Sequence, residues 1–283
     1  MNSLLRLVRR LATMPGLRRL TQVDALMRIS LSLRSSLVRD PWRFVWNELR
    51  PGRRVTATYR LKESGVAITI RHKSHDILIL DEVFSQREYR FPEPVLSRLA
   101  DRTGQSLKVA DIGANIGLFG AWILGRFPEA EIVALEPDPA NAELHRVTIE
   151  ENGRAATWHL VEAGAMTKAG TVRFSIGEFA RSHVARADEA GIAVEGVDVF
   201  PLIADVDLLK IDIEGAEWPI LQDPRFGKLG AEAVVLEYHP EGSPGPEPAR
   251  AAETLLAEAG FKLAAHQRKD SGTGVLWALS SSS

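Results

Sequence analysis

The chain has 283 residues, of which 45% are hydrophobic and 25% are charged, a composition typical of a folded globular protein and not of a disordered one. Cysteine is absent, which excludes disulfides, cysteine-ligated metal centres and a cysteine nucleophile. A reducing compartment suits such a sequence, so we expect a cytoplasmic protein. The net charge of −2 is unevenly distributed, because residues 1–60 carry +10 and the rest carries −12.

The basic N-terminal region is expected to form a helical extension over residues 1–50. Arginines interrupt its first apolar stretch, so we predict no secretory signal there. No run of 18 apolar residues occurs, so we predict no membrane span. Residues 1–30 would either pack within this protein, mediate self-association, or lie peripherally on an anionic membrane.

Residues 51–90 are expected to form a β-hairpin followed by a helical cap. Side chains alternate between apolar and polar over 55–61 and again over 66–71, with a turn between them. After residue 90 the pattern changes, because apolar strand-like segments alternate with helical ones. This alternation predicts an α/β domain over 91–283, with a mostly parallel sheet covered by helices on both faces.

The expected elements of this domain follow one another at regular intervals. The strands fall at 107–113, 131–137, 157–163, 206–212 and 233–238. The helices fall at 116–127, 138–152, 215–223 and 246–260.

A glycine-rich turn joins the first of these strands to its helix, with Asp111 at the strand end and Gly113, Asn115 and Gly117 after it. A dinucleotide-binding turn would have glycine at position 115 and also at 118, where this chain has Leu118. The turn is therefore less suited to a pyrophosphate. The Asp111 carboxylate would repel phosphate and attract an ammonium group. These features favour S-adenosylmethionine, which carries an ammonium and a sulfonium, over NAD.

The next two strand ends are compatible with a nucleoside. Glu136 follows the second strand and can accept hydrogen bonds from both ribose hydroxyls. Glu162 and Ala163 follow the third strand, where a small residue leaves room for adenine and Glu162 can accept from its amino group. Taken alone, Asp111 fits a helix cap and Glu136 a solvated turn acid. Together, on consecutive strands, they favour a nucleoside site.

The fourth strand contains Lys210 and Asp212 on one face. A lysine within an apolar strand requires an acidic partner, and Asp212 is the nearest candidate in sequence. Acids in the following turn, such as Glu214, also suit a helix dipole. Because ligands bind at the carboxyl ends of parallel strands, several ionisable residues should meet at one edge. They are Asp111, Glu136, Asp212, Glu214, Glu237 and His239.

These segments together resemble the FkbM-type family of S-adenosylmethionine-dependent methyltransferases. The resemblance rests on residues 109–120, 134–153, 206–221 and 234–240, with 75–89 upstream. It implies a class I methyltransferase fold, which is a Rossmann-like sheet of seven strands with the last antiparallel. It also implies O-methylation of a hydroxyl on a small molecule, sugar or natural product.

The resemblance also implies roles for the residues that match its motifs. The methionine end of the cofactor would contact Asp111, Gly113, Asn115 and Gly117. Glu136 would hold the ribose, and Asp212 would lie near the reacting centre.

The acceptor hydroxyl must lose its proton during attack, and Asp212 and His239 are the candidate bases. Lys210 would orient or stabilise the carboxylates. An alternative has Mg²⁺ held by Asp212, Glu214 and Glu237. A metal-free site is favoured, because Lys210 already supplies positive charge.

Two other classes of function remain open. One is a non-catalytic module with the same fold, and the other is an NAD-type oxidoreductase, which the missing glycines disfavour. A nucleic-acid substrate is not expected, because the region that would bind it is acidic.

Overall fold

The computed structural model describes residues 31–52, 54–86, 88–100, 105–175, 183–184, 192–269 and 271–281. It divides into two compact units, of which the first ends at Glu88 and the second begins at Tyr89. The helix expected within residues 1–30 lies outside the described residues. The predicted boundaries at residues 50 and 90, between the N-terminal extension, the hairpin region and the α/β domain, stay predictions. Within the described residues, no helix combines the length and apolarity needed to cross a membrane.

The first unit contains the predicted hairpin, which is confirmed. Its elements are α3 (Pro41–Leu49), β1 (Thr56–Arg60), β2 (Ala67–Arg71), α4 (Asp76–Leu80) and the π-helical turn η1 (Asp81–Ser85). The strands β1 and β2 are antiparallel, with Thr56 opposite Arg71. Helix α3 begins at Pro41 because the side chain of Asp40 accepts a hydrogen bond from the Arg43 amide.

Aromatic residues form the core of this unit. The Phe44 ring lies 5.4 Å from that of Tyr59 and 5.0 Å from that of His72. His72 is fully buried, with Nε2 2.7 Å from the Tyr59 hydroxyl and Nδ1 2.9 Å from a Glu48 oxygen. His72 is therefore a packing residue whose two nitrogens are both engaged.

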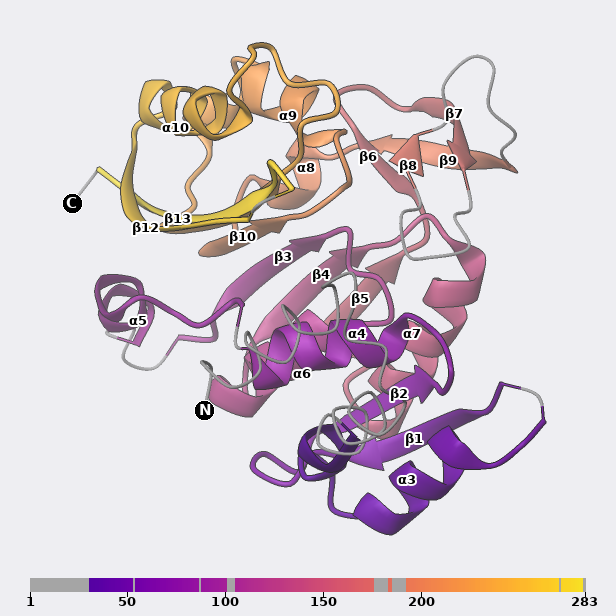
Figure 1. Cartoon of the computed structure of the whole chain (residues 1–283). Coiled ribbons are helices and arrows are strands. Elements are labelled where there is room, and N and C mark those ends of the chain that lie inside the picture. The colour runs from indigo at the N-terminus through magenta and orange to yellow at the C-terminus, as the bar shows by residue number, and fades with distance from the viewer. Residues whose placement is uncertain are drawn as a thin grey trace, which may run out of the picture. The chain divides into compact units, whose positions relative to one another are not determined.

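The second unit is built on a seven-stranded sheet in the order β12-β13-β11-β10-β3-β4-β5 (Figure 1). Adjacent strands are parallel except at β13, which is antiparallel to both of its neighbours. This arrangement confirms the predicted class I fold with an antiparallel last strand. The strands are β3 (Lys108–Ile112), β4 (Glu131–Leu135), β5 (Trp158–Val161), β10 (Leu208–Ile211), β11 (Ala233–Tyr238), β12 (Phe261–Arg268) and β13 (Gly274–Ser280).

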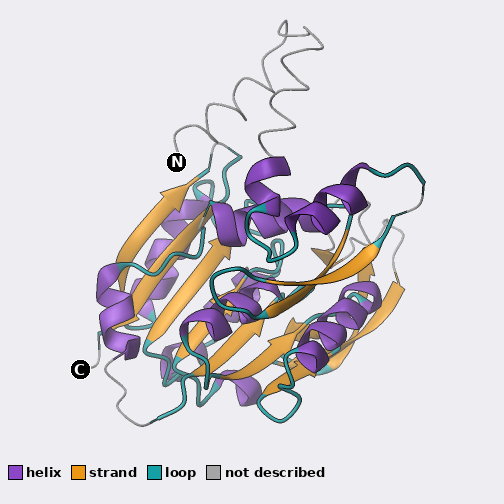
Figure 2. Ribbon diagram, turned by 90° about the horizontal axis from the view of Figure 1, so that it is seen from below, coloured by secondary structure: helices purple, strands orange, loops and turns teal. Residues whose placement is uncertain are grey.

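Helices cover both faces of this sheet (Figure 2). They are α5 (Glu93–Ala100), α6 (Leu118–Arg126), α7 (Pro139–Glu151), α8 (Phe200–Ile203), α9 (Glu217–Gln222), the 3₁₀ turn η2 (Phe226–Lys228) and α10 (Pro248–Glu258). The four helices predicted from periodicity are confirmed as α6, α7, α9 and α10. Phe200, Trp218 and Leu256 of α8, α9 and α10 pack in one buried cluster with Leu209 and Val234 of the sheet.

A second, four-stranded sheet lies between β5 and α8 in the chain and was not predicted. Its order is β6-β9-β7-β8. The strands are β6 (Gly164–Met166), β7 (Gly170–Ser175), β8 (His183–Val184) and β9 (Ile192–Asp198). Strand β9 is largely exposed and buries few apolar side chains, so its sequence lacks the apolar pattern on which strand prediction depends.

The strand register brings the functional segments to one edge of the main sheet. Lys210 of β10 pairs directly with Asp111 of β3, and Ile112 of β3 pairs with Leu135 of β4. Because these strands are parallel, the residues that follow each of them lie side by side.

Candidate functional site

The glycines of the turn after β3 are required by contacts within the protein itself. A Cβ on Gly113 would lie 1.8 Å from the backbone oxygen of Asp212, and the φ angle of Gly113 is +79°. A Cβ on Gly117, with φ of +84°, would lie 2.5 Å from the His145 ring. The family resemblance implied that these glycines contact the cofactor. The structure adds a stronger reason, because the turn packs directly against the loop after β10.

Glu136 ties the end of β4 to this turn. Its carboxylate accepts hydrogen bonds from the backbone amides of Asn115, at 2.8 Å, and Asp138, at 2.9 Å. Only 5% of Glu136 is exposed, so it is not a solvated turn acid. Burial raises the pKa of Glu136 to about 7, although these hydrogen bonds oppose the shift. Asn115 has a left-handed backbone with φ of 49° and accepts from the Ile116 amide.

Lys210 and Asp111 form a buried ion pair across β10 and β3. The Lys210 Nζ lies 3.2 Å from Asp111 Oδ1 and 3.7 Å from Asp212 Oδ2, and it donates to the Gly113 carbonyl at 2.7 Å. Asp212, the partner expected from the sequence, lies within ion-pair distance, but Asp111 is closer because the register places it directly opposite Lys210. Burial alone would lower the pKa of Lys210, but the charges of Asp111 and Asp212 raise it.

The Asp111 carboxylate retains capacity for a ligand. It is fully buried, and among the described residues neither oxygen accepts a hydrogen bond. Asp111 does not cap helix α6 in this structure. Lys210 lies near Oδ1, and Oδ2 has no partner among the described residues, so this oxygen suits an ammonium group, which is the group expected from the sequence.

Asp212 and Glu237 are connected through residues that the sequence did not identify. The Tyr89 hydroxyl lies 3.1 Å from Asp212 Oδ2 and 3.3 Å from Glu237 Oε2. Lys269 Nζ lies 2.6 Å from Glu237 Oε1. Tyr89 closes the segment 75–89 that carried part of the family resemblance, and this was the one signal available. Lys269 follows a sheet-edge strand, and no pattern indicated it.

His239 is held by a buried carboxylate. Its Nδ1 lies 3.3 Å from Glu217 Oε1, and Glu217 also accepts from the backbone amides of His239 and Gly215. Burial alone would lower the pKa of His239, but the hydrogen bond to Glu217 and the charge of Asp212 raise it to about 9. His239 is thus protonated at neutral pH in the free protein, which leaves Asp212 as the better candidate base.

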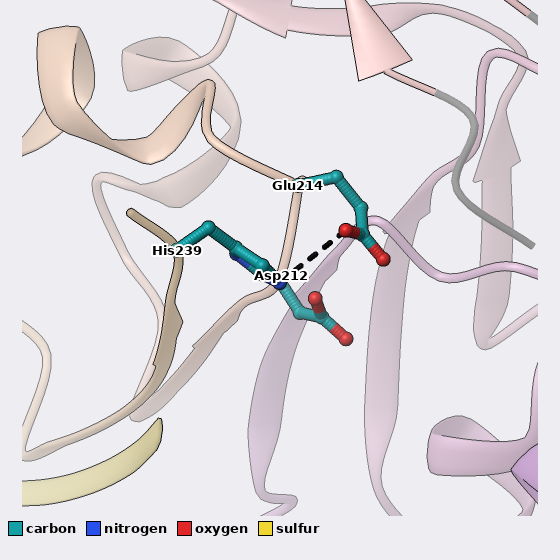
Figure 3. Close-up of side chains that lie close together, drawn as sticks. All are labelled: Asp212, Glu214 and His239. Atoms are coloured by element: carbon teal, nitrogen blue, oxygen red, sulfur yellow. Dashed lines mark ion pairs between the residues drawn. The ribbon is translucent and has the colours of Figure 1, made fainter. Parts of the chain in front are cut away.

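Asp212, Glu214 and His239 form a cluster of potential metal ligands. One ligand atom from each lies within 4.8 Å of the other two (Figure 3). The alternative metal set from the sequence contained Glu237 in place of His239. In the structure Glu237 pairs with Lys269, and His239 points toward Glu214, with Nε2 3.4 Å from its Oε2.

The segment after β5 fits the adenine prediction less directly. Glu162 is exposed and forms an ion pair with Arg146 of α7 at 2.9 Å. Ala163 is buried at the same edge of the sheet. The predicted contacts of both residues with adenine stay predictions.

The strand order, the single antiparallel strand and the glycine turn at the carboxyl edge define a class I methyltransferase domain. Residues 111–263 match the methyltransferase FkbM domain. This match covers more than half of the chain, so the chain belongs to the FkbM family of methyltransferases.

Two curated fungal proteins are similar to this chain. Methyltransferase sdnD of Sordaria araneosa is 27% identical over 195 residues, which cover 55% of this chain and 73% of that protein. Methyltransferase 1 of Beauveria bassiana is 27% identical over 185 residues, which cover 55% of this chain and 72% of that protein. Among solved structures, methyltransferase FkbM from Methylobacillus flagellatus is 14% identical with a TM-score of 0.46. That match covers 90% of this chain but only 60% of the solved one.

The buried ion pair generates a stability prediction. Replacing Lys210 by Met leaves the buried Asp111 carboxylate without its cation, so we expect the free energy of unfolding to fall by about 3–5 kcal/mol. Adding Asp111→Asn to Lys210→Met should restore part of this loss, because the two effects are coupled. Denaturant unfolding measures both.

Lys262 of β12 is exposed and provides a matched control for the lysine-to-methionine change. Lys262→Met should change the free energy of unfolding little. Strictly additive effects of Lys210→Met and Asp111→Asn would contradict the pairing.

Proposed function

We propose that this chain is an S-adenosylmethionine-dependent O-methyltransferase that acts on a hydroxyl of a small molecule, sugar or natural product. The observation that carries the proposal is the Asp111 carboxylate, which is buried at the glycine turn and accepts no hydrogen bond from the described residues. When bound, the cofactor supplies an activated methyl group. Asp111 would hold its ammonium and Glu136 its ribose hydroxyls.

Asp212 is the residue best placed to take the acceptor proton. About a quarter of its side chain is exposed, whereas its neighbour Asp111 is fully enclosed. The Tyr89 hydroxyl and the Lys210 ammonium both contact the same Asp212 oxygen. These contacts fix the direction of the carboxylate, which is what a positioned general base requires.

The other classes of function fit these contacts less well. Acidic groups concentrate at the carboxyl edge, which opposes binding of nucleic acid and of the NAD pyrophosphate. A non-catalytic module would bind the cofactor and show no turnover, so activity measurements separate it from an enzyme. The proposal places the enzyme in the cytoplasm, in keeping with a sequence that lacks cysteine.

Cofactor choice and its pH dependence can be measured by calorimetry. S-adenosylmethionine or its demethylated product should bind more tightly than NAD. Because the pKa of Glu136 lies near 7 and its ionised form accepts hydroxyl hydrogen bonds better, affinity should rise between pH 6 and pH 8. Glu136→Ala should weaken binding by about 1–3 kcal/mol and remove this pH dependence. Equal or tighter NAD binding would refute the cofactor assignment.

The role of Asp212 can be tested by single-turnover measurements with labelled cofactor, after a screen of hydroxylated metabolites and sugars. Asp212→Asn should reduce the rate by about 10²-fold or more and leave cofactor affinity within a few fold. Asp205→Asn is the matched control, because Asp205 is 90% exposed and lies outside the site. A folded Asp212→Asn protein with the parent rate would remove Asp212 from the mechanism.

A further inference from the structure

We infer that Asp212, Glu214 and His239 bind a divalent transition-metal ion of the Mn²⁺ type. This inference deepens the proposed function and rests on it, since the ion would lie where the acceptor hydroxyl is expected. The three side chains come from the loops after β10 and β11. Their nearest nitrogen and oxygen atoms lie within 4.8 Å of one another (Figure 3), which is the spacing of ligands around one ion.

His239 already has the orientation of a metal ligand. Its Nδ1 faces the fully buried Glu217, which two backbone amides fix in place. Its Nε2 faces Glu214 at 3.4 Å. Histidines that ligate metals usually donate their other ring N–H to a carboxylate or carbonyl, which sets the tautomer and the ring direction. Glu217 supplies this carboxylate, and Nε2 is thereby directed at the cluster.

The charges around His239 favour a cation. The two lysines of the site lie nearest to other carboxylates, since Lys210 is closer to Asp111 than to Asp212 and Lys269 pairs with Glu237. Asp212, Glu214 and Glu217 therefore surround one imidazole, and a bound cation would take the place of the proton on its Nε2. The preference for a metal-free site assumed that Lys210 neutralises Asp212. In the structure one ammonium is shared between Asp111, at 3.2 Å, and Asp212, at 3.7 Å, so it cannot balance both carboxylates.

The ligand types select the class of metal. One imidazole nitrogen and two carboxylate oxygens suit a first-row transition ion better than Mg²⁺, which prefers oxygen alone. Three protein ligands leave coordination positions open for water or the acceptor hydroxyl. A hydroxyl on such an ion loses its proton more readily. Asp212 would then influence turnover as a ligand.

Titration of the full chain with Mn²⁺, followed by electron paramagnetic resonance, tests this inference without any turnover. We expect one bound ion, bound more tightly than Mg²⁺. Glu214→Gln and His239→Ala should each weaken binding at least tenfold. Glu214→Gln is the decisive variant, because Glu214 is about one-third exposed and its replacement leaves the core intact. His159→Ala, on the exposed side of β5, is the matched control.

S-adenosylmethionine binding is measured on the same samples. A protein that binds the cofactor but no Mn²⁺, or whose Mn²⁺ affinity survives Glu214→Gln, would overturn the metal site and leave the methyltransferase proposal standing. A protein that binds Mn²⁺ at these residues but not the cofactor would support the metal site and refute the proposed cofactor.

Helix α3 of the first unit exposes three large apolar side chains. Trp42, Trp46 and Leu49 are 81%, 65% and 66% exposed, and their spacing of four and three residues places them on one helix face. Phe44 and Asn47 on the other face are buried. Large apolar side chains are rarely exposed together without a partner. We propose that this face docks on an anionic membrane surface.

The positive charge of residues 31–60 favours an anionic membrane, and not a second copy of the chain, as the partner of this helix face. Residues 31–60 contain seven arginines and two acids, and Arg39, Arg43 and Arg54 are exposed. Tryptophan prefers the bilayer interface, and arginine is attracted to anionic headgroups. A symmetric contact between two such faces would bring like charges together, which opposes self-association.

Co-sedimentation with vesicles tests this surface. The full chain should bind phosphatidylcholine vesicles containing one-quarter phosphatidylserine, and pure phosphatidylcholine vesicles much less. Replacing Trp42 and Trp46 by Ser should reduce binding at least tenfold, whereas Leu263→Ser, at an exposed leucine of β12, should not. Unchanged binding by the double variant would overturn the proposal and point to residues 1–30. A dimer in light scattering that the double variant abolishes would identify a second copy as the occupant and also overturn it.

Discussion

The buried ammonium of Lys210 is the interaction on which the carboxyl edge of the sheet depends. It lies between Asp111 on β3 and Asp212 after β10, and it donates to the Gly113 carbonyl. One positive charge thus joins the glycine turn to the acidic loop. The same closeness explains Gly113, because any Cβ there would collide with the Asp212 backbone. A buried charge of this kind contributes little net stability, but it fixes which groups face one another.

The distribution of charge along the edge follows from that pairing. Because Lys210 is shared between Asp111 and Asp212, the other acids of the edge have further partners. Tyr89 contacts Asp212 and Glu237, and Lys269 pairs with Glu237. His239 is enclosed by Glu214 and Glu217. The edge therefore has a fully enclosed carboxylate at Asp111 and a more exposed one at Asp212. The proposed function would place the cofactor ammonium at the enclosed carboxylate and the acceptor hydroxyl at the exposed one.

Helix α3 shows a different physical constraint. Its inner face completes an aromatic core with Tyr59 and His72, which fixes the rotation of the helix. The tryptophans at positions 42 and 46 must then face outward. Their exposure is thus a consequence of packing on the opposite face, and it gives the first unit a surface unlike the acidic edge of the second.

The fold class follows from sequence patterning alone, because apolar strands alternating with amphipathic helices have few stable arrangements. The sequence also determined which residues end the strands, since local patterning sets where each strand stops. It did not determine the closest partner of Lys210, because cross-strand register depends on the whole sheet and not on the two-residue period within β10. The positions of Tyr89, Glu217 and Lys269 were likewise decided only by tertiary structure. These residues lie on segments distant in sequence or within a helix, and their proximity to Asp212, His239 and Glu237 exists only once the sheet has assembled.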